Sequence, residues 1–491
     1  MVTVMKKICA VSLSLLLISQ LAACQSTQPE NEVTTTSGDT YTDTTAGADS
    51  YEPAAGDLGG DTFTILNTSQ TYNFYSYLDF EEATGETLDD AIYERNRAVE
   101  ELYNFTLEIV EYELEAANTA LSTAVLAGDD SYDAAFLRDY YLKKELTDGY
   151  LMNIDTIPEM RLDEPWWDGA VTEESRLGKS RQALFAMTDV SLCDFEGTLV
   201  TFINENILTD LGLDAPYDLV REGKWTFDKL VEYMKAGANL NGDDSFTLTQ
   251  DGNAVYGMVS YQRFGPGMLA GAGIDSAYID EDGRPQVSYS GDLFFDYCDK
   301  LKSAMSVAGE YLYTNTGTVN DYTHYENVFK SGRALMTLAQ LKAANNYRDM
   351  TDAYGILPVP KYDESQDSYH CLRTYTYLLC IPVTNSRPHE TGAIMDAMSY
   401  YTYRDIMPSF YEERVSQKLL RGEDSIDMLE IVRESRKFDV GSVLNIFLPL
   451  ADNVIDACLR SNTELASKLA STLPSIEATI DTLMESIDSG M

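Results

Sequence analysis

Basic residues are scarce in this sequence, whereas acidic residues are abundant. Its 491 residues include 35 Lys and Arg against 80 Asp and Glu, which gives a formal net charge of -45 at pH 7. A protein that binds a phosphate backbone or docks on an anionic lipid surface needs clustered Lys and Arg. We therefore expect no nucleic-acid partner and no electrostatic attachment to a membrane.

Histidine and the common enzyme motifs are also missing or incomplete. The chain has 3 His, too few for a His-rich metal site, and we expect neither a metal nor a cofactor. Gly178-Lys179-Ser180 looks like the end of a phosphate-binding loop, but Glu173 stands where that loop needs its first glycine. His389-Glu390 lacks the second histidine of a zinc protease. The sequence thus predicts a protein that is not an enzyme, although a glycosidase using two of the many carboxylates stays open as an alternative.

Long apolar runs are absent apart from one at the N-terminus. Lys6 and Lys7 precede the run Ile8 to Ile18, which is too short for a membrane span and is typical of a secretion signal. The run ends in Leu21-Ala22-Ala23-Cys24, which resembles the lipobox of bacterial lipoproteins. That resemblance implies a signal peptide over residues 1–23, cleavage before Cys24, and a lipid on the Cys24 thiol. An ordinary signal peptide followed by an incidental cysteine is the alternative.

The segment that follows Cys24 has the composition of a flexible linker. Gln25 to Gly60 is rich in Thr, Gly and acidic residues and contains no Lys or Arg. Such a segment buries too little apolar surface to offset its ordering entropy. We expect residues 24–60 to form a disordered tether.

Cysteines in the body of the chain are odd in number and have no metal-binding spacing. They are Cys193, Cys298, Cys371, Cys380 and Cys458. We expect buried free thiols, and a Cys371–Cys380 disulfide stays open.

Strand and helix patterns alternate along the body. Residues 61–66, 105–110, 134–137 and 198–204 have the alternation or apolar character of strands. Helical stripes lie between them and continue later, as in Phe227, Leu230, Val231 and Met234, with Thr226 as a predicted N-cap. Further stripes lie on both sides of Pro474. This order predicts an α/β protein of two bodies with mainly parallel sheets, and Asp280–Gly283 predicts a hairpin turn.

The order of short motifs along the body resembles the family 1 extracellular solute-binding lipoproteins of ABC importers, a maltose-binding-protein-like class. The motifs that carry the resemblance are Ala127-Gly128-Asp129-Asp130-Ser131-Tyr132-Asp133, Pro165-Trp166-Trp167-Asp168, Thr201-Phe202-Ile203-Asn204, Gly223-Lys224-Trp225-Thr226-Phe227-Asp228, Phe329-Lys330-Ser331-Gly332-Arg333-Ala334, Tyr354-Gly355-Ile356-Leu357-Pro358, Pro360-Lys361-Tyr362-Asp363 and Ile381-Pro382-Val383-Thr384. One departure concerns the segment after Met336, where sugar binders of the family often carry a Trp and this chain has Thr337-Leu338-Ala339-Gln340.

The resemblance implies a two-lobed periplasmic-binding-protein-like fold of type II, with the lobes joined by a hinge. Lobe 1 is expected over residues 61–188 and 373–405, and lobe 2 over residues 189–372 and 406–491. It also implies a small-molecule solute, a sugar or oligosaccharide, held between the lobes and delivered to ABC permease subunits. We expect a monomer, anchored by lipid at the extracellular face of the bacterial cytoplasmic membrane.

Candidate ligand-binding residues follow from the rule that ligands of open α/β sheets bind beyond the carboxyl ends of strands. An aromatic face can stack on a sugar ring, while carboxylates and guanidinium groups hydrogen-bond its hydroxyls. In the sugar-binding relatives, an Asp in the position resembling Asp139 accepts hydrogen bonds from hydroxyls. By this rule we predict Tyr72, Tyr75, Arg138 and Asp139 as site residues. The resemblance adds Arg263 and Phe264, which resemble the aromatic contact region of the second lobe, and Asp189 and Tyr375, which lie near the two expected crossovers. A cationic or peptide solute in an acidic cleft remains an alternative to sugar.

Overall fold

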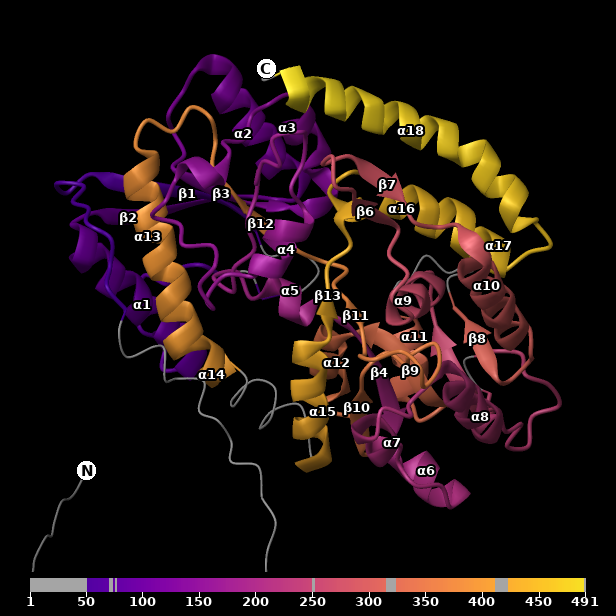
Figure 1. Ribbon diagram of the computed structural model, residues 1–491. Helices are drawn as coiled ribbons and strands as arrows, with labels where there is room; N and C mark the ends of the chain where they lie inside the picture. Colours follow the sequence, from indigo (N-terminus) through magenta and orange to yellow (C-terminus); the bar gives the residue numbers. More distant parts are fainter. Residues whose placement is uncertain are drawn as a thin grey trace, which may run out of the picture. The chain divides into compact units, whose positions relative to one another are not determined.

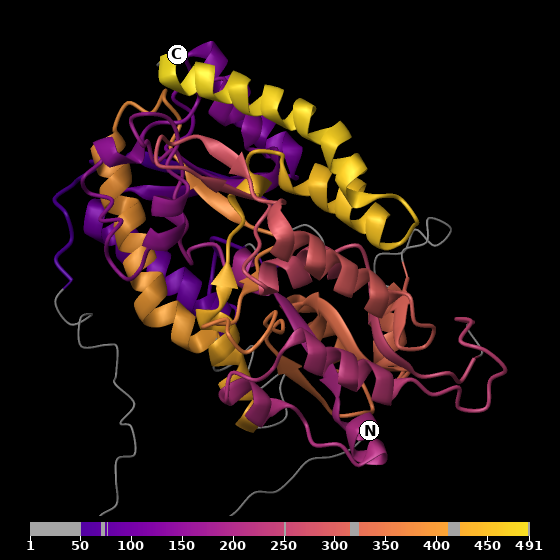
Figure 2. The same cartoon turned by 45° about the vertical axis from the view of Figure 1, so that its right-hand side comes forward.

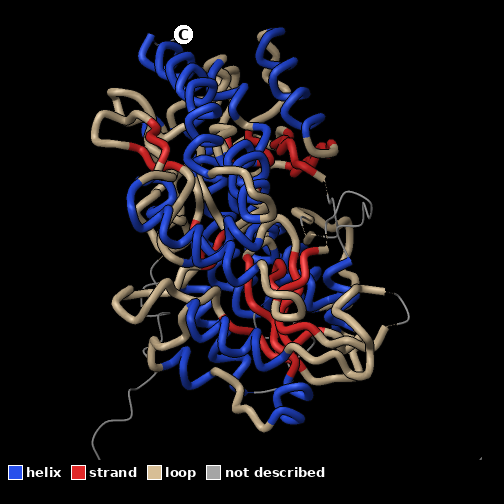
Figure 3. The backbone as a smooth tube through the Cα atoms, turned by 90° about the vertical axis from the view of Figure 1, so that its right-hand side faces the viewer, coloured by secondary structure: helices blue, strands red, loops and turns tan. Residues whose placement is uncertain are grey.

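The computed structural model describes residues 51–69, 74–75, 77–249, 252–314, 324–410 and 423–489. Residues 1–23, Cys24 and Tyr72 lie outside the described residues. The strands form two main sheets with helices around them (Figure 1, Figure 3). We call the first sheet with its helices the first lobe, and the second sheet with its helices the second lobe. No helix within the described ranges combines the length and the apolar character needed to cross a membrane.

The first sheet has the strand order β12-β3-β1-β2. Its strands are β1 (Thr62–Thr68), β2 (Thr106–Tyr112), β3 (Ala134–Arg138) and β12 (Tyr377–Cys380). Strand β1 pairs in parallel with β2 and β3, whereas β12 is antiparallel to β3. The chain steps from β1 to β2 in one direction and from β2 to β3 in the other. Right-handed crossovers therefore place α1 (Thr87–Tyr103) and α2 (Glu115–Ala127) on opposite faces of this sheet.

The second sheet has the strand order β10-β4-β9-β5-β8. Its strands are β4 (Leu199–Asn204), β5 (Tyr256–Ser260), β8 (Tyr311–Tyr313), β9 (Ala334–Gln340) and β10 (Tyr354–Leu357). Four of them run in one direction, because β5 is parallel to β8 and β9 while β4 is antiparallel to both β9 and β10. The helices α8 (Phe227–Gly237), α11 (His324–Lys330) and α15 (Glu423–Glu434) pack against this sheet.

The prediction of mainly parallel sheets is confirmed, with one reversed strand in each sheet. The reversed strands are β12 and β4, and each is the strand whose chain has just arrived from the other lobe. Strand β12 starts at Tyr377 opposite Arg138, where β3 ends, and β4 starts at Leu199 opposite Gln340, where β9 ends. A chain that enters a sheet at the edge where the neighbouring strand ends runs antiparallel to that strand.

Three crossing segments, residues 189–198, 371–376 and 436–439, run side by side between the sheets. Thr198 pairs with Arg373 in an isolated bridge. Strand β11 (Cys371–Leu372) pairs in parallel with β13 (Arg436–Lys437), and Figure 1 shows both strands between the two sheets. These segments form the hinge.

The C-terminal helix α18 (Leu465–Ser489) contacts both lobes. Its start lies beside the end of the second lobe, and its end lies beside α3 (Lys143–Thr147) of the first lobe (Figure 2). The sequence pattern suggested separate helical stripes around Pro474, but one helix runs through it. Pro474 is on the exposed side of the helix, so the carbonyl that loses its N–H partner can be solvated by water.

A second contact between the lobes, which we call the clasp, joins residues 177–182, 280–284 and 486–488. The hairpin of β6 (Ala277–Ile279) and β7 (Pro285–Val287) confirms the predicted turn. At its tip the carbonyl of Gly283 accepts a hydrogen bond of 2.9 Å from the Gly178 amide. The Asp488 carboxylate of α18 accepts a bond of 3.0 Å from the Lys179 amide. The clasp therefore holds loop, hairpin and helix together across the two lobes.

Several local predictions are confirmed at the level of single residues. The hydroxyl of Thr226 accepts from the Lys229 amide and caps α8. All five body cysteines are buried free thiols. Residues 51–60 fall within the predicted tether, yet they pack on the first lobe: the Tyr51 ring stacks on Tyr400 at 3.9 Å, and Leu58 is buried. A composition average over the whole segment conceals these two apolar side chains.

Candidate functional site

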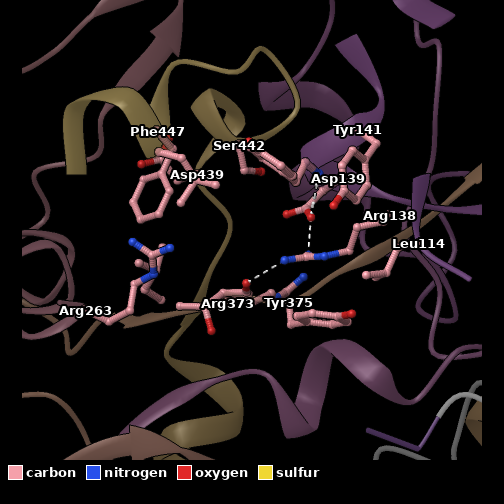
Figure 4. A pocket seen from close by; sticks show the side chains of 14 residues that line it. Leu114, Arg138, Asp139, Tyr141, Arg263, Arg373, Tyr375, Asp439, Ser442 and Phe447 are labelled. Carbon is pink, nitrogen blue, oxygen red and sulfur yellow. Dashed lines mark hydrogen bonds and ion pairs between the residues drawn. The ribbon is translucent and has the colours of Figure 1, made fainter. Parts of the chain in front are cut away.

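A pocket of about 120 Å³ lies where the two lobes meet (Figure 4). Its lining comes from the end of β3, the second and third crossing segments, and the start of α9 (Phe264–Gly271) and of α16 (Phe447–Leu450). The lining residues are Leu114, Arg138, Asp139, Tyr140, Tyr141, Arg263, Leu372, Arg373, Thr374, Tyr375, Asp439, Ser442, Phe447 and Leu448. The pocket is thus built by chain segments that lie up to 334 positions apart in the sequence, from Leu114 to Leu448.

Asp139 is the most deeply buried acid on the first-lobe side of the pocket. It is 2% exposed and begins a short helical turn directly after β3. One carboxylate oxygen accepts from the Arg138 guanidinium and, at 2.7 Å, from the Tyr140 amide. Burial raises the pKa of Asp139, while Arg138, the Tyr140 amide and the Ser442 hydroxyl lower it. The group is a strong hydrogen-bond acceptor in a nearly dry position.

Arg138 lies flat over the ring of Tyr375. Its guanidinium carbon is 3.6 Å from the ring centroid, and Nη2 donates to the Thr374 carbonyl at 3.2 Å. Phe74 stacks on the same ring at 4.1 Å with an interplanar angle of 15°. Both groups lie along the ring normal, so they must occupy opposite faces. Tyr375 therefore offers no free face for stacking on a ligand.

This stack continues into the second lobe. The ammonium group of Lys342, which follows β9, lies 4.0 Å from the centroid of Phe74. Lys342, Phe74, Tyr375 and Arg138 together form a cation–aromatic–aromatic–cation column. Such contacts contribute about 0.5–2 kcal/mol each when partly desolvated, and the column bounds one side of the pocket.

The second-lobe side of the pocket carries a guanidinium beside an aromatic ring. Arg263 immediately precedes α9, and its Nη1 pairs with Asp452 at 2.6 Å. Its guanidinium carbon lies 5.5 Å from the Phe447 ring centroid. Figure 4 shows Arg263 and Phe447 across the cavity from Arg138 and Asp139. The first lobe thus presents a donor and an acceptor to the cavity, and the second lobe presents a donor and an apolar ring.

Asp439 and Ser442 close the pocket from the third crossing segment. The Asp439 carboxylate accepts from the Ser276 amide at 2.7 Å, the Ser276 hydroxyl at 2.8 Å and the Gly441 amide at 2.8 Å. Burial raises the pKa of Asp439, and the Ser276 and Gly441 donors lower it. These bonds tie the pocket wall to the start of the β6–β7 hairpin.

Ion pairs hold the crossing segments together behind the pocket. Arg373 pairs with Asp168 at 2.6 Å and with Asp194 at 3.7 Å. Arg436 of β13 pairs with Asp194 at 3.1 Å and with Asp189 at 3.8 Å. Burial and the neighbouring Asp194 raise the pKa of Asp189, whereas Arg436 and Arg373 lower it. The three crossing segments are thus linked by charge as well as by backbone bonds.

The structure brings together four of the predicted site residues and separates the others from them. Arg138, Asp139, Arg263 and Tyr375 line the pocket, whereas Asp189 lies in the ion-pair network behind it. The remaining described residues do not line the pocket: Tyr75 is buried with its hydroxyl on Asp89, and Phe264 is fully buried, 4.7 Å from the ring of Tyr311. Tyr72 lies outside the described residues.

Sequence reasoning missed ten of the fourteen residues that line the pocket. Tyr141, Arg373 and Thr374 lie within two positions of Asp139 or Tyr375, so a wider window around the same predicted positions would have included them. Asp439, Ser442 and Phe447 follow β13, which reaches the pocket only by pairing with β11. Two-residue strands separated by more than sixty positions carry no periodicity signal, so no local pattern points to them.

Side-chain chemistry at the pocket does not suggest a metal. Within the described residues no cluster of three or more His, Cys, Asp or Glu has the geometry to hold an ion. The tryptophans are also elsewhere: Trp166 and Trp167 donate to Asp396, and Trp225 donates to the Pro358 carbonyl. All three are buried, so they serve packing.

Comparison with known proteins gives a family and a fold. The model of the family described as "Bacterial extracellular solute-binding protein" matches residues 81–401. No curated protein matches the sequence.

Solved structures of two-lobed solute-binding proteins share the fold. A cyclo/maltodextrin-binding protein complexed with maltotetraose is 12% identical, with a TM-score of 0.57 over 86% of this chain and 97% of that chain. An ABC substrate-binding protein from Listeria monocytogenes in complex with cycloalternan is 12% identical, with a TM-score of 0.53 over 86% and 99%. A solute-binding protein from Agrobacterium radiobacter K84 in complex with ribitol is 13% identical, with a TM-score of 0.51 over 86% and 99%.

Proposed function

Because the chain belongs to the bacterial extracellular solute-binding protein family, we propose that it captures a carbohydrate between its two lobes and delivers it to an ABC importer. The single observation that supports this most is the composition of the pocket wall. Arg138 and Asp139 come from the first lobe, and Arg263 and Phe447 from the second lobe and its C-terminal extension. A ligand that contacts both sides stabilises the closed arrangement only, so binding shifts the equilibrium between open and closed forms.

The chemistry of the lining suits a sugar. Sugar hydroxyls can donate to the Asp139 carboxylate and accept from the guanidinium groups of Arg138 and Arg263. The ring of Phe447 supplies an apolar surface for sugar C–H groups. The similar structures include complexes with maltotetraose, cycloalternan and ribitol, all of them rich in hydroxyl groups.

We propose that the protein is a monomer anchored by lipid at the outer face of the cytoplasmic membrane. Its anchor is Cys24, followed by a linker that ends where Tyr51 packs on the first lobe. The proposed lobe boundaries are residues 61–188 with 373–405, and residues 189–372 with 406–491. Metabolic labelling with a fatty acid, compared between the wild type and Cys24→Ser, tests the anchor: label on both proteins would contradict it.

Calorimetric titration tests the carbohydrate site. We expect Asp139→Ala to weaken binding of the best carbohydrate at least tenfold, because a hydrogen bond to a charged group contributes about 1.5–3 kcal/mol. The matched control is Asp189→Ala, which removes an acid next to the pocket but leaves the lining residues unchanged. The affinity of this variant for the same carbohydrate should differ from that of the wild type by less than threefold.

Two results would contradict the proposed function. One is equal affinity of Asp139→Ala and the wild type for the same sugar. The other is hydrolysis of a glycan by the purified protein that a single Asp or Glu substitution abolishes, since this result would make the protein a glycosidase.

A further inference from the structure

We infer that the site takes a neutral solute of a single sugar ring, in preference to an oligosaccharide, a uronate or an amino sugar. This inference rests on the proposed function and narrows it. Three features of the pocket carry it: its size, the aromatic surfaces that remain free, and the charge balance of its wall.

The pocket is small for a ligand site. Its volume of about 120 Å³ lies below the roughly 300–1,000 Å³ typical of sites for larger organic ligands. This space suits one ring-sized solute better than a chain of four rings.

Contacts between the lobes bound the pocket on two sides. On one side stands the column of Lys342, Phe74, Tyr375 and Arg138, which runs from the end of β9 to the end of β3. On the other side Asp439 is bonded to Ser276, and the hairpin that follows Ser276 reaches Gly178 of the first lobe through the clasp. A glycan that extended toward either of these two sides would break one of these contacts.

Few aromatic faces are free to stack on successive rings. All three tryptophans are buried away from the pocket with their indole N–H groups bonded. Tyr375 is covered on both faces. Phe447, Tyr140 and Tyr141 remain in the lining, and the last two meet edge to face at 4.8 Å. This leaves one principal apolar wall, which is what a single ring needs.

The charges of the wall are balanced before any ligand enters. Each guanidinium in the lining has a carboxylate partner: Arg138 has Asp139, Arg263 has Asp452 at 2.6 Å, and Arg373 has Asp168 at 2.6 Å. The other lining acid, Asp439, is engaged by three donors. A uronate would compete with an existing carboxylate, and an amino sugar with an existing guanidinium. A neutral solute bonds to the remaining N–H groups and lone pairs without breaking a pair.

Isothermal titration with matched sugar sets tests the inference on the full mature chain. One set is D-glucose, maltotetraose, D-glucuronate and D-glucosamine, and two others are the corresponding galactose and mannose series. We expect at least one neutral monosaccharide to bind at least tenfold more tightly than the tetrasaccharide, the uronate and the amino sugar of its set. Tighter binding of a tetrasaccharide, a uronate or an amino sugar would overturn the inference while leaving carbohydrate binding intact. Failure of every sugar to bind would overturn the proposed function as well.

A substitution in the wall gives a second, independent readout. Phe447→Ala removes a ring that lines the pocket, so we expect the ratio of disaccharide to monosaccharide affinity to rise at least fivefold. Tyr112→Ala is the control, because that tyrosine is exposed and does not line this pocket. An unchanged ratio in a folded Phe447→Ala protein would contradict the size argument. If Phe447→Ala does not fold, the wild-type titrations decide alone.

Discussion

Asp139 combines near-complete burial with a role as hydrogen-bond acceptor, which makes its protonation matter for binding. Burial raises its pKa above the ordinary value of 3.8, although Arg138, the Tyr140 amide and Ser442 oppose the shift. A sugar hydroxyl that donates to the carboxylate favours the ionised form and so lowers this pKa in the complex. Affinity should therefore rise as the pH rises through the pKa of free Asp139 and become constant above it.

Titration calorimetry between pH 4 and pH 8 checks this expectation. In the wild type we expect the affinity to fall as the pH decreases. The fall should begin above pH 3.8, because the pKa of free Asp139 is raised above that value. Asp139→Asn should bind more weakly at pH 8 and show no such slope. Asp189→Asn is the control, because burial also raises the pKa of Asp189 but that group does not line the pocket. A slope that persists in Asp139→Asn would assign the titration to another group.

Asp396 shows how one buried carboxylate can hold several segments. It is 1% exposed and accepts from Trp166 at 2.9 Å, Trp167 at 3.0 Å and Arg161 at 3.1 Å. The Tyr51 hydroxyl donates to it at 3.3 Å. Removing the carboxylate leaves two indole N–H groups without their acceptor and a half-buried guanidinium with only its bond to the Glu52 carbonyl.

We expect Asp396→Ala to lower the free energy of unfolding by about 3–5 kcal/mol, the loss typical of a broken buried pair. Urea unfolding followed by tryptophan fluorescence measures it. Asp424→Ala, which breaks an exposed pair with Arg221, should cost at most about 1 kcal/mol. Similar losses of unfolding free energy in the two variants would show that the buried contacts of Asp396 stabilise the first lobe no more than an exposed ion pair does.

At the level of elements, the clasp depends on two glycines that meet backbone to backbone. Gly283 has a φ of 74°, and a Cβ added there would lie 2.1 Å from the carbonyl oxygen of Gly178. Gly212 has a φ of 66° but open space around it. Alanine at either position carries a left-handed backbone penalty of about 1–2 kcal/mol, and only Gly283→Ala must also push the hairpin away from the first lobe.

We therefore expect Gly283→Ala to lower the melting temperature more than Gly212→Ala, by a further few degrees. It should also speed limited proteolysis at the 177–182 loop, because the contact between that loop and the hairpin is lost. Differential scanning calorimetry and peptide mapping measure both effects. Equal melting temperatures and equal cleavage would show that the clasp is not a tight contact in solution.

Sequence patterns gave the elements whose signal is local. The strands β1 to β4 and the helix α8 were predicted within a few residues, because alternation, helical stripes and the Thr226 cap are properties of consecutive residues. The β11–β13 pair was beyond reach, since its two strands have two residues each and meet only in the folded chain. The prediction of separate helices on the two sides of Pro474 was wrong for a related reason. Whether a proline ends a helix depends on the exposure of the helix face on which it lies, and the local pattern does not show this.

The same limit divides the candidate site. Arg138 and Asp139 could be predicted as candidate site residues because they lie at the carboxyl end of a buried strand, where ligands of α/β sheets bind. Arg263 and Phe264 are neighbours, yet Arg263 lines the pocket while Phe264 starts α9 and lies in the core. Sequence alone does not say which of two adjacent residues faces a cavity at a helix start. Tyr375 lines the pocket, but no local pattern shows that its ring is covered, because its two stacking partners come from distant segments.

For the whole molecule, burial of the pocket implies that the lobes must separate before a solute enters. Asp139 is 2% exposed and Phe447 is 6% exposed, so a ring-sized molecule cannot reach them by rearranging side chains alone. The three crossing segments connect the lobes, and the clasp and the column are the contacts that opening must break. Ligand contacts with both lobes add to these contacts only in the closed form, so a bound ligand shifts the equilibrium toward that form.

Small-angle X-ray scattering measures this equilibrium directly. We expect the radius of gyration to decrease when the best neutral monosaccharide saturates the wild type, since the ligand binds the closed form more tightly than the open one. The extent of closure at saturation depends on the open–closed equilibrium constant of the empty protein multiplied by the ratio of these two affinities. Arg263→Gln removes a contact made from the second lobe, so at saturation it should show less compaction than the wild type, even when more sugar compensates for its weaker binding. Tyr112→Ala should compact like the wild type, because it alters neither the pocket lining nor the crossing segments.

Identical scattering profiles with and without a bound sugar would contradict the hinged mechanism. Full compaction of Arg263→Gln would show that the second lobe closes without contacting the ligand through Arg263.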